Sequence, residues 1–249
     1  MIRRPPRSTH CISSAASDVY KRQSKRFVNS LGLDWTKYST QIELKDNLAT
    51  MISYQENLNN VLIDFSQDIW LYISKGYIKQ LTKDKEVGSS TMPHKVNPID
   101  FENAEGNLKL SNSLLISIKE KIQISRMQRD LSDSTTLRNL GSALSYSYLA
   151  ITSLIKGLSK IQANREKLSE DLEANWEVLT EAIQTILRKN NVENSYEKIK
   201  KLSRGKSFDK NSYLAIIAAL DISEEDKTKL SDLTPLKYIG LAEKLAKEI

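Results

Sequence analysis

The sequence predicts an all-α protein, with a long helical bundle followed by a small helical C-terminal domain. Three observations lead to this prediction. Three long segments repeat apolar residues at the three- and four-residue spacing of a helix. Proline and glycine are scarce, with five prolines and eight glycines among 249 residues. No run of alternating apolar and polar residues is long enough to require a sheet.

The first predicted helix covers residues 41–81. This segment contains no proline, and its only glycine is Gly76. Its apolar residues recur on one face at helical spacing: Leu48, Ile52, Leu58, Leu62, Phe65, Ile69 and Ile73. A continuous helix of about forty residues would be about 60 Å long, which suits a bundle core or a subunit interface.

Two more long helices complete the predicted bundle, which we assign to a central domain at 24–158. One begins near Asp100, because acidic residues favour a helix N-terminus. It can bury Phe101, Ala104, Leu108, Leu115 and Ile118. The other covers 133–158 and carries a near-heptad seam of Leu137, Leu140, Leu144, Ile151, Ile155 and Leu158. Three apolar stripes of this length need one another for burial, which makes a bundle.

The segment 159–249 contains shorter amphipathic stretches and is predicted to form the helical C-terminal domain. Asn164 can cap a helix that runs towards Lys189. Thr234 followed by Pro235 is typical of an N-cap and a first helical residue. Residues 203–208 read as a basic turn between helices.

The charge distribution argues against a nucleic-acid partner. The net charge of +6 is concentrated in residues 1–26, where Asp18 is the only acidic residue against seven basic ones: Arg3, Arg4, Arg7, Lys21, Arg22, Lys25 and Arg26. The remaining chain is neutral, so it has little general attraction for phosphate backbones. No apolar run reaches the roughly 18–20 residues that span a bilayer, so no membrane role is predicted. The single cysteine, Cys11, fits a reducing compartment, and we expect a cytoplasmic location.

Residues 1–23 differ in character from the rest of the chain. They lack the apolar core of a secretory signal, whereas their Arg- and Ser-rich, acid-poor composition suggests a transit peptide as one alternative. The stretch also resembles a translated sequencing-library adapter. We expect it to be a non-native artefact, and we expect His10 and Cys11 to carry no function.

A loop is predicted at 88–98, which reads GSSTMPHKVNP. Pro93 and Pro98 lie five residues apart and forbid a continuous helix. Lys95 and Asn97 can hold a carboxylate whose charge rises in a transition state. With strong local electrostatics, a serine of this loop could then take a proton from carbon.

Other interpretations of this loop stay open on residue types alone. It can be a surface loop rich in turn-forming residues. It is not a P-loop, because the glycine that should precede Lys95 is missing. A metal site is not predicted, because His94 is the only histidine after residue 23 and has no Cys/His cluster around it.

Four separated motifs resemble one known family. The loop GSSTMPHKVNP is similar to the signature of the fumarase/aspartase superfamily. The segments IDFENAEGNL (99–108), SRMQRDLSDSTTLRNLG (125–141) and 172–206 are similar to its bacterial-type adenylosuccinate lyases. The resemblance covers about residues 24–249. It implies a partial central bundle domain of the fumarase/aspartase fold, a lyase that releases fumarate from a succinyl-nucleotide substrate, no metal or organic cofactor, and a homotetramer whose active sites combine residues from three subunits.

The resemblance also implies roles for residues of the signature loop. Ser89 matches the catalytic base, which removes a proton from the succinyl carbon. Lys95 and Asn97 match residues that hold the substrate carboxylates and the developing charge. Gln41 and Ser90 match positions that contact the substrate.

The segment at 125–141 resembles the phosphate-binding part of these lyases through Arg129, Ser134 and Arg138. The residue types fit this role, because guanidinium groups bind phosphate oxygens in pairs and a hydroxyl adds a donor. Considered alone, each arginine also fits a solvated helix face.

Members of this family carry an upstream motif of the type T-H-x-Q, whose histidine supplies the general acid. The sequence contains no such motif. General acid–base assistance is worth about 10² to 10⁴-fold, so we expect the chain as given to be nearly inactive alone. The alternative is a non-catalytic helical oligomerisation module.

Overall fold

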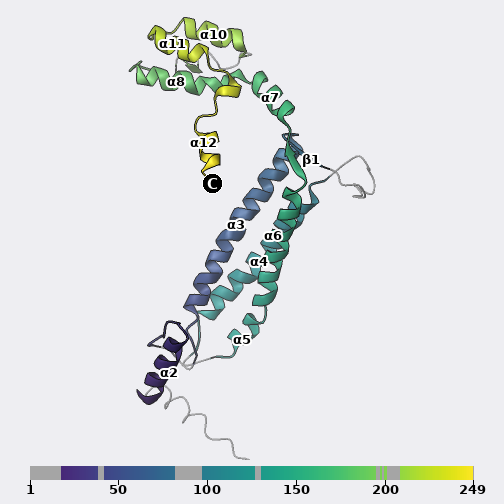
Figure 1. Ribbon diagram of the computed structural model, residues 1–249, viewed down its shortest axis with the longest axis vertical. Coiled ribbons are helices and arrows are strands. Elements are labelled where there is room, and N and C mark those ends of the chain that lie inside the picture. The colour runs from purple at the N-terminus through teal and green to yellow at the C-terminus, as the bar shows by residue number, and fades with distance from the viewer. Residues whose placement is uncertain are drawn as a thin grey trace, which may run out of the picture. The chain divides into compact units, whose positions relative to one another are not determined.

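The computed structural model describes residues 18–38, 42–81, 97–126, 130–194, 197, 199–200 and 208–248. Helices dominate this part of the chain, and the predicted all-α class is confirmed (Figure 1). The strands in it are β1 (Ile78–Gln80) and β2 (Ile161–Ala163), which pair as a small two-stranded sheet that the sequence did not predict.

The chain divides into two compact units. Unit 1 comprises Met1–Lys75 and Gln80–Gln162, and unit 2 comprises Gly76–Lys79 and Ala163–Ile249. The domain limits proposed from the sequence, 24–158 and 159–249, stay a prediction.

Unit 1 is built on three long helices that lie side by side, α3 (Asp46–Ser74), α4 (Ile99–Ile122) and α6 (Leu140–Leu158) (Figure 1). α4 packs against both α3 and α6. Two shorter helices, α2 (Asp18–Ser30) and α5 (Ser132–Leu137), complete the unit. α2 extends across the limit at residue 23 that the sequence suggests for the artefact.

The face predicted for α4 is confirmed. Phe101, Ala104, Leu108, Leu115 and Ile118 are each at most 1% exposed. Their regular spacing places them on one side of the helix, which meets its two neighbours.

The predicted extent of the first long helix, 41–81, is wrong at both ends. α3 has 29 residues and begins after Lys45, whose φ is 63°. It ends at Ser74, and Gly76 follows with a φ of 76°. A left-handed residue interrupts the helical hydrogen bonds, and glycine adopts it without a steric penalty. The chain then continues as β1 instead of helix.

The predicted third helix, 133–158, is two helices. Leu137, Leu140 and Leu144 of its predicted seam pack against the buried cluster, whereas the later residues of the seam do not form the buried face. The helix is interrupted at Arg138 and Asn139, between α5 and α6. α6 buries a row of mostly small residues instead: Ala143, Ser147, Ala150, Leu154 and Gly157. Of the predicted seam, Ile155 is 64% exposed and Leu158 is 43% exposed. Small residues let α6 approach α4 closely.

A buried polar network ties the three helices together. The Asn59 side chain of α3 is fully buried, and its Nδ2 donates to Ser111 Oγ at 3.1 Å and Asn112 Oδ1 at 2.8 Å on α4. Its Oδ1 accepts from Gln55 Nε2 at 3.0 Å and from Ser147 Oγ of α6 at 2.7 Å. All four hydrogen-bonding positions of the amide are therefore used.

Unit 2 contains α7 (Arg165–Ala174), α8 (Thr180–Lys189), α10 (Lys210–Ala218), α11 (Glu224–Ser231) and α12 (Ala242–Lys247), with the 3₁₀ helices η1 (Trp176–Leu179) and η2 (Pro235–Lys237). Asn164 caps α7 as predicted, accepting from the Lys167 N–H at 3.5 Å. The helix predicted to run from there to Lys189 is interrupted at Asn175. Thr234 and Pro235 do begin a helical turn, which is η2.

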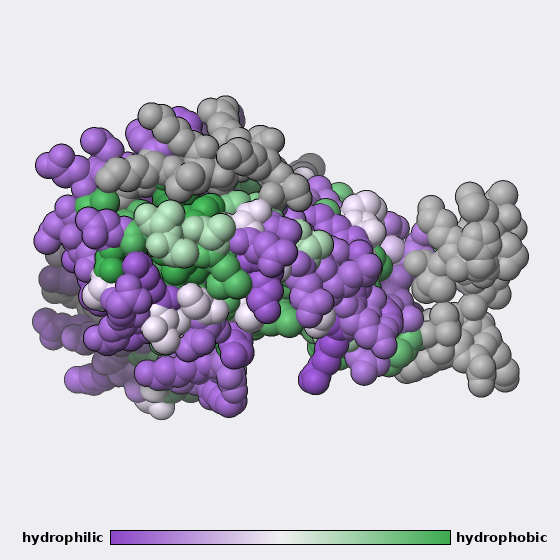
Figure 2. All heavy atoms as spheres, turned by 90° about the horizontal axis from the view of Figure 1, so that it is seen from above, coloured by the Kyte–Doolittle hydropathy of each residue, from purple (hydrophilic) through white to green (hydrophobic). Residues whose placement is uncertain are grey.

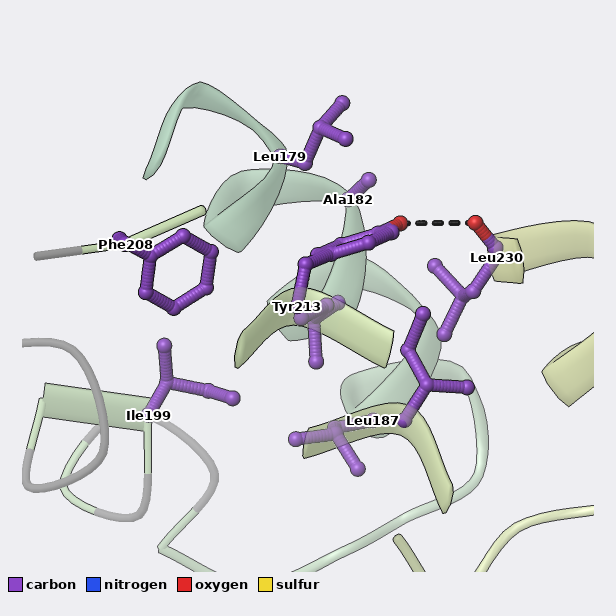
Figure 3. Packing of buried hydrophobic residues seen from close by; sticks show 9 residues of the cluster. Leu179, Ala182, Leu187, Ile199, Phe208, Tyr213 and Leu230 are labelled. Atoms are coloured by element: carbon purple, nitrogen blue, oxygen red, sulfur yellow. Dashed lines mark hydrogen bonds between the residues drawn. The ribbon is translucent and has the colours of Figure 1, made fainter. Parts of the chain in front are cut away.

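The core of unit 2 is centred on Tyr213, which is 0% exposed (Figure 3). Its hydroxyl donates to the Leu230 carbonyl at 2.8 Å, and burial raises the pKa of Tyr213 to about 12. The Trp176 and Phe208 rings pack against it at centroid distances of 5.5 and 6.5 Å. Phe208 is the last residue of the predicted basic turn, and residues 201–207 lie outside the described part of the chain.

A second polar contact in unit 2 joins α8 to α11. Asp226 is 3% exposed, and its carboxylate accepts from Lys189 Nζ and from Asn190 Nδ2, both at 2.8 Å. The hydrogen bonds from Lys189 and Asn190 lower the pKa of Asp226 to about 2. The carboxylate is therefore ionised at neutral pH and links two helices.

Hydrophilic side chains cover most of the face seen in Figure 2, with hydrophobic side chains exposed between them. None of the helices in the described part of the chain combines the length and hydrophobicity that crossing a membrane requires.

The Asn59 network predicts that Asn59→Leu lowers the free energy of unfolding by about 3 kcal/mol, because buried partners on α4 and α6 lose their hydrogen bonds. The measurement is calorimetry of the chain. Asn57→Leu, at an exposed position of the same helix, is the matched control and should change stability little. Equal effects of the two substitutions would show that the network does not hold the bundle.

The Asp226 contact predicts an acid-sensitive unit 2. Because the folded pKa lies below the ordinary 3.8, the stabilisation is present above about pH 4 and is lost as the pH falls towards 2. Asp226→Asn should lower the melting temperature at pH 6 and flatten its decline between pH 4 and 2. Asp232→Asn makes the same change at an exposed aspartate and is the control. It should leave the decline of the melting temperature unchanged. A decline as steep in Asp226→Asn as in the wild type would contradict the assignment.

Candidate functional site

The structure describes three of the eight predicted site residues: Asn97, Ser134 and Arg138. The other five, Gln41, Ser89, Ser90, Lys95 and Arg129, lie outside the described residues. Their roles stay predictions.

Asn97 is half-buried and lies two residues before α4. Its carbonyl accepts from the Ile99 N–H at 2.9 Å. The Pro98 carbonyl accepts from the Phe101 and Glu102 N–H groups at 3.0 and 3.2 Å, so the first turn of α4 is fastened directly to the end of the signature segment.

Ser134 and Arg138 lie on one helical turn. Ser134 is half-buried in α5, and its hydroxyl donates to the Leu131 carbonyl at 2.8 Å. Arg138 is exposed and follows α5 with helical dihedrals, φ −58° and ψ −22°. Residues four apart in a helix face the same side, so the hydroxyl and the guanidinium can address one ligand.

Asp130, which the sequence did not indicate as a site residue, connects Ser125 and Lys121 to the start of α5. The Asp130 N–H donates to Ser125 Oγ at 3.1 Å, and Oδ1 accepts from the Ser132 N–H at 2.9 Å and from the Ser132 hydroxyl. Lys121 Nζ of α4 lies 3.6 Å from the same oxygen. The Ser132 hydrogen bonds lower the pKa of Asp130. The spacing Asp130-x-Ser132 is the available sequence signal, because aspartate often accepts from a backbone N–H two residues on.

Asp133, the second residue of α5, is 8% exposed, and its Oδ1 has no hydrogen-bond partner among the described residues. Buried polar atoms are normally paired. The segment therefore presents a buried acceptor next to the donors of Ser134 and Arg138.

The two described parts of the predicted site lie at opposite ends of α4. Asn97 precedes its first residue, whereas Leu137 and Leu140, on either side of Arg138, pack against the cluster that contains Ile118 and Ile122. Figure 1 shows α5 at the end of the bundle opposite to β1. At 1.5 Å per residue, the 24 residues of α4 separate the two parts by about 35 Å. One copy of the chain does not bring them together.

Within the described ranges, no three His, Cys, Asp or Glu side chains are grouped so that they could hold a metal ion.

Comparison with known proteins agrees with the fold and the motifs. A family model described as "Lyase" matches residues 13–111, and one described as "Adenylosuccinate lyase C-terminal" matches residues 125–239. The chain belongs to the fumarase/aspartase superfamily, a class of helical lyases.

Within this superfamily, the chain is similar to bacterial adenylosuccinate lyases. It is 54% identical to the enzyme of Legionella pneumophila (strain Corby) over 228 residues, which are 92% of this chain and 50% of that protein. It is 49% identical to the Escherichia coli (strain K12) enzyme over 91% of this chain and 50% of that protein. The chain thus spans about half the length of the curated relatives it matches.

Solved structures share the fold at lower identity. The 3-carboxy-cis,cis-muconate lactonizing enzyme of Pseudomonas putida matches with a TM-score of 0.66 at 18% identity, over 94% of this chain and 54% of that one. The fumarate lyase:delta crystallin of Brucella melitensis bound to cobalt matches with a TM-score of 0.60 at 20% identity, over 89% of this chain and 48% of that one.

Proposed function

We propose that this chain is the part of an adenylosuccinate lyase that carries the signature serine and the phosphate-binding segment. The reaction is elimination across a C–N bond, which converts adenylosuccinate into AMP and fumarate. The same activity would act on the succinylated aminoimidazole carboxamide ribotide of purine synthesis. The observation that carries the proposal is the identity of 54% and 49% to two adenylosuccinate lyases over more than nine-tenths of the chain.

In this proposal Ser89 is the catalytic base. It takes a proton from the succinyl carbon next to a carboxylate, and the carbanion's charge spreads onto that carboxylate. Lys95 and Asn97 hold the carboxylates and stabilise this charge. The C–N bond then breaks, the departing nitrogen takes a proton from a general acid, and fumarate is released. Gln41 and Ser90 contact the substrate, and no metal or organic cofactor takes part.

The nucleotide phosphate is assigned to Arg129, Ser134 and Arg138. The placement of the last two on one turn supports this, because a guanidinium binds phosphate oxygens and the Ser134 hydroxyl can exchange its bond to the Leu131 carbonyl for one to the same phosphate. The hydrogen bonds that Asp130 makes with Ser125 and Ser132 also support this, because they hold the residue that follows Arg129 in place.

The site is proposed to form between copies of the chain, in a homotetramer. The separation of Asn97 from Arg138 by the length of α4 supports this, because a second copy can supply at each end the residue that the first copy holds at the other end. The bundle also exposes large apolar side chains to solvent: Met51, Tyr54, Leu58 and Val61 on α3, and Tyr148, Leu149 and Ile155 on α6. Such surfaces are typical of subunit interfaces. The enzyme is assigned to the cytoplasm, with a small-molecule succinyl-nucleotide as substrate.

The competing proposal is a non-catalytic oligomerisation module. The same exposed apolar residues favour it, because a module needs an interface but no site. Fumarate production distinguishes the two proposals, since a module assembles without turning over substrate.

The lyase proposal predicts that the chain releases fumarate from adenylosuccinate when it is co-expressed with the N-terminal half of the Escherichia coli enzyme. Ser89→Ala should lower this rate by about 10² to 10⁴-fold, the usual value of acid–base assistance. Ser113→Ala, at an exposed position of α4, is the control and should keep the wild-type rate. Full activity of Ser89→Ala would remove Ser89 from its role. Assembly without any fumarate from the wild type would favour the module.

The phosphate assignment predicts that Arg138→Ala raises KM for adenylosuccinate by about 10 to 100-fold, because one charge-assisted pair is lost. The measurement is steady-state kinetics of the same co-expressed assembly. Arg188→Ala, which removes an exposed arginine of α8, should leave KM unchanged. An unaltered KM in Arg138→Ala would assign the phosphate to other residues.

A further inference from the structure

The segment 82–96, which carries Ser89, Ser90 and Lys95, is flanked by two described residues, Leu81 and Asn97. The chain enters this segment beside Lys160, because the Leu81 N–H donates to the Lys160 carbonyl at 2.6 Å. This bond directly follows the pairing of β1 with β2.

The chain leaves the segment beside the same lysine. Lys160 Nζ donates to Asp100 Oδ2 at 2.9 Å, in the first turn of α4 and three residues after Asn97. Lys156 Nζ lies 3.1 Å from the other carboxylate oxygen, Oδ1. The Lys160 side chain is 11% exposed and that of Lys156 is 61% exposed, so Lys160 makes the less screened of the two contacts.

The charges of this contact are matched. Partial burial raises the pKa of Asp100, but the hydrogen bonds from Lys160 and Lys156 outweigh it, and the pKa lies below its ordinary value. The carboxylate is therefore ionised at neutral pH. A buried ammonium group is tolerated when such a partner faces it, and breaking the pair leaves an uncompensated charge.

Gly157 makes the contact possible. A Cβ on Gly157 would lie 2.9 Å from Phe101 Cζ and 3.1 Å from Asp100 Cβ. Phe101 is 1% exposed, so its ring is enclosed by neighbouring groups. The C-terminal end of α6 therefore lies directly against the N-terminal end of α4, within reach of Lys160.

We propose that Lys160 is a positioning residue of the lyase: its backbone carbonyl holds the chain before the signature segment, and its ammonium group holds Asp100 just after that segment. The inference rests on the proposed function, because Ser89 and Lys95 are catalytically relevant only in a lyase. Lys160 acts by fixing Leu81 and Asp100, which lie on either side of the signature segment, and a displacement of about 1 Å at a catalytic site can cost 10²-fold in rate.

A purely structural role is the competing explanation, because the Lys160 N–H also donates to the Gly157 carbonyl at 3.0 Å and closes the end of α6. Two readouts separate the explanations. Local amide exchange reports whether the start of α4 is released, and the division between kcat and KM reports whether the catalytic segment is misplaced.

The first measurement is hydrogen exchange of the chain itself, with Lys160→Met, which keeps the apolar stem and removes the charge. The Phe101 and Glu102 amides should exchange about tenfold faster, whereas Leu115 in the middle of α4 should be unchanged. Lys156→Met, which removes the exposed partner of the same carboxylate, is the matched control and should change exchange by less than about threefold. If the Phe101 and Glu102 amides of Lys160→Met exchange at the wild-type rate, or if Leu115 is accelerated equally, Lys160 does not hold the start of α4.

The second measurement is fumarate release by the co-expressed assembly. Lys160→Met should lower kcat by about 10 to 100-fold with KM changed less than about threefold, and Lys160→Arg should restore most of kcat. Asp100→Asn, which keeps the side-chain shape, is the second variant should Lys160→Met fail to fold, and it should show the same pattern. Unchanged kcat in these variants would overturn the positioning role. If the wild type releases no fumarate, the proposed function fails. The exchange experiment still decides whether Lys160 holds the start of α4.

Discussion

The packing of α4 against both α3 and α6 is the constraint on which the rest of unit 1 depends. One face of α4 is fully buried, and the polar network of Asn59 fixes it against both neighbours. A small-residue row on α6 brings the two helices close enough for Phe101 to rest on Gly157. Because the buried polar groups are hydrogen-bonded to one another and the apolar groups are closely packed, α4 is held firmly over its length of about 35 Å.

The length of α4 sets the distance between the two described parts of the predicted site. Asn97 lies at one end of α4, and the turn that carries Ser134 and Arg138 lies at the other. In the proposed lyase, assembly is therefore a condition for chemistry, because α4 holds the two parts of the predicted site apart within one copy. The exposed apolar residues of α3 and α6 would give that assembly a driving force. In this proposal the subunit interface also forms the active site.

Hydrophobic periodicity predicts the long helices of unit 1, but it predicts the whole buried face correctly only for α4. Of the stripe predicted for α3, Leu58 is 46% exposed. The buried face of α4 follows from its large apolar residues. The buried face of α6 could not be found this way, because Ala143, Ser147 and Gly157 carry little hydrophobic signal and matter through close approach. The end of α3 depends on the left-handed conformation of Gly76. Hydrophobic periodicity does not detect this conformation, because apolar residues continue beyond Gly76. For the site, motifs indicate residue types and chemistry, whereas the contact of Lys160 with Asp100 joins positions sixty residues apart and needs the tertiary structure.

In the proposed lyase, each site takes its two halves from different copies of the chain. Asn97→Ala and Arg138→Ala variants are mixed in one assembly with the N-terminal half of the Escherichia coli enzyme, and fumarate release is measured at a substrate concentration well below the wild-type KM, where each variant alone is slow. The mixture should regain up to about a quarter of the wild-type rate, the share of sites that receive both native residues on random mixing. A mixture that stays as slow as either variant alone would contradict this arrangement.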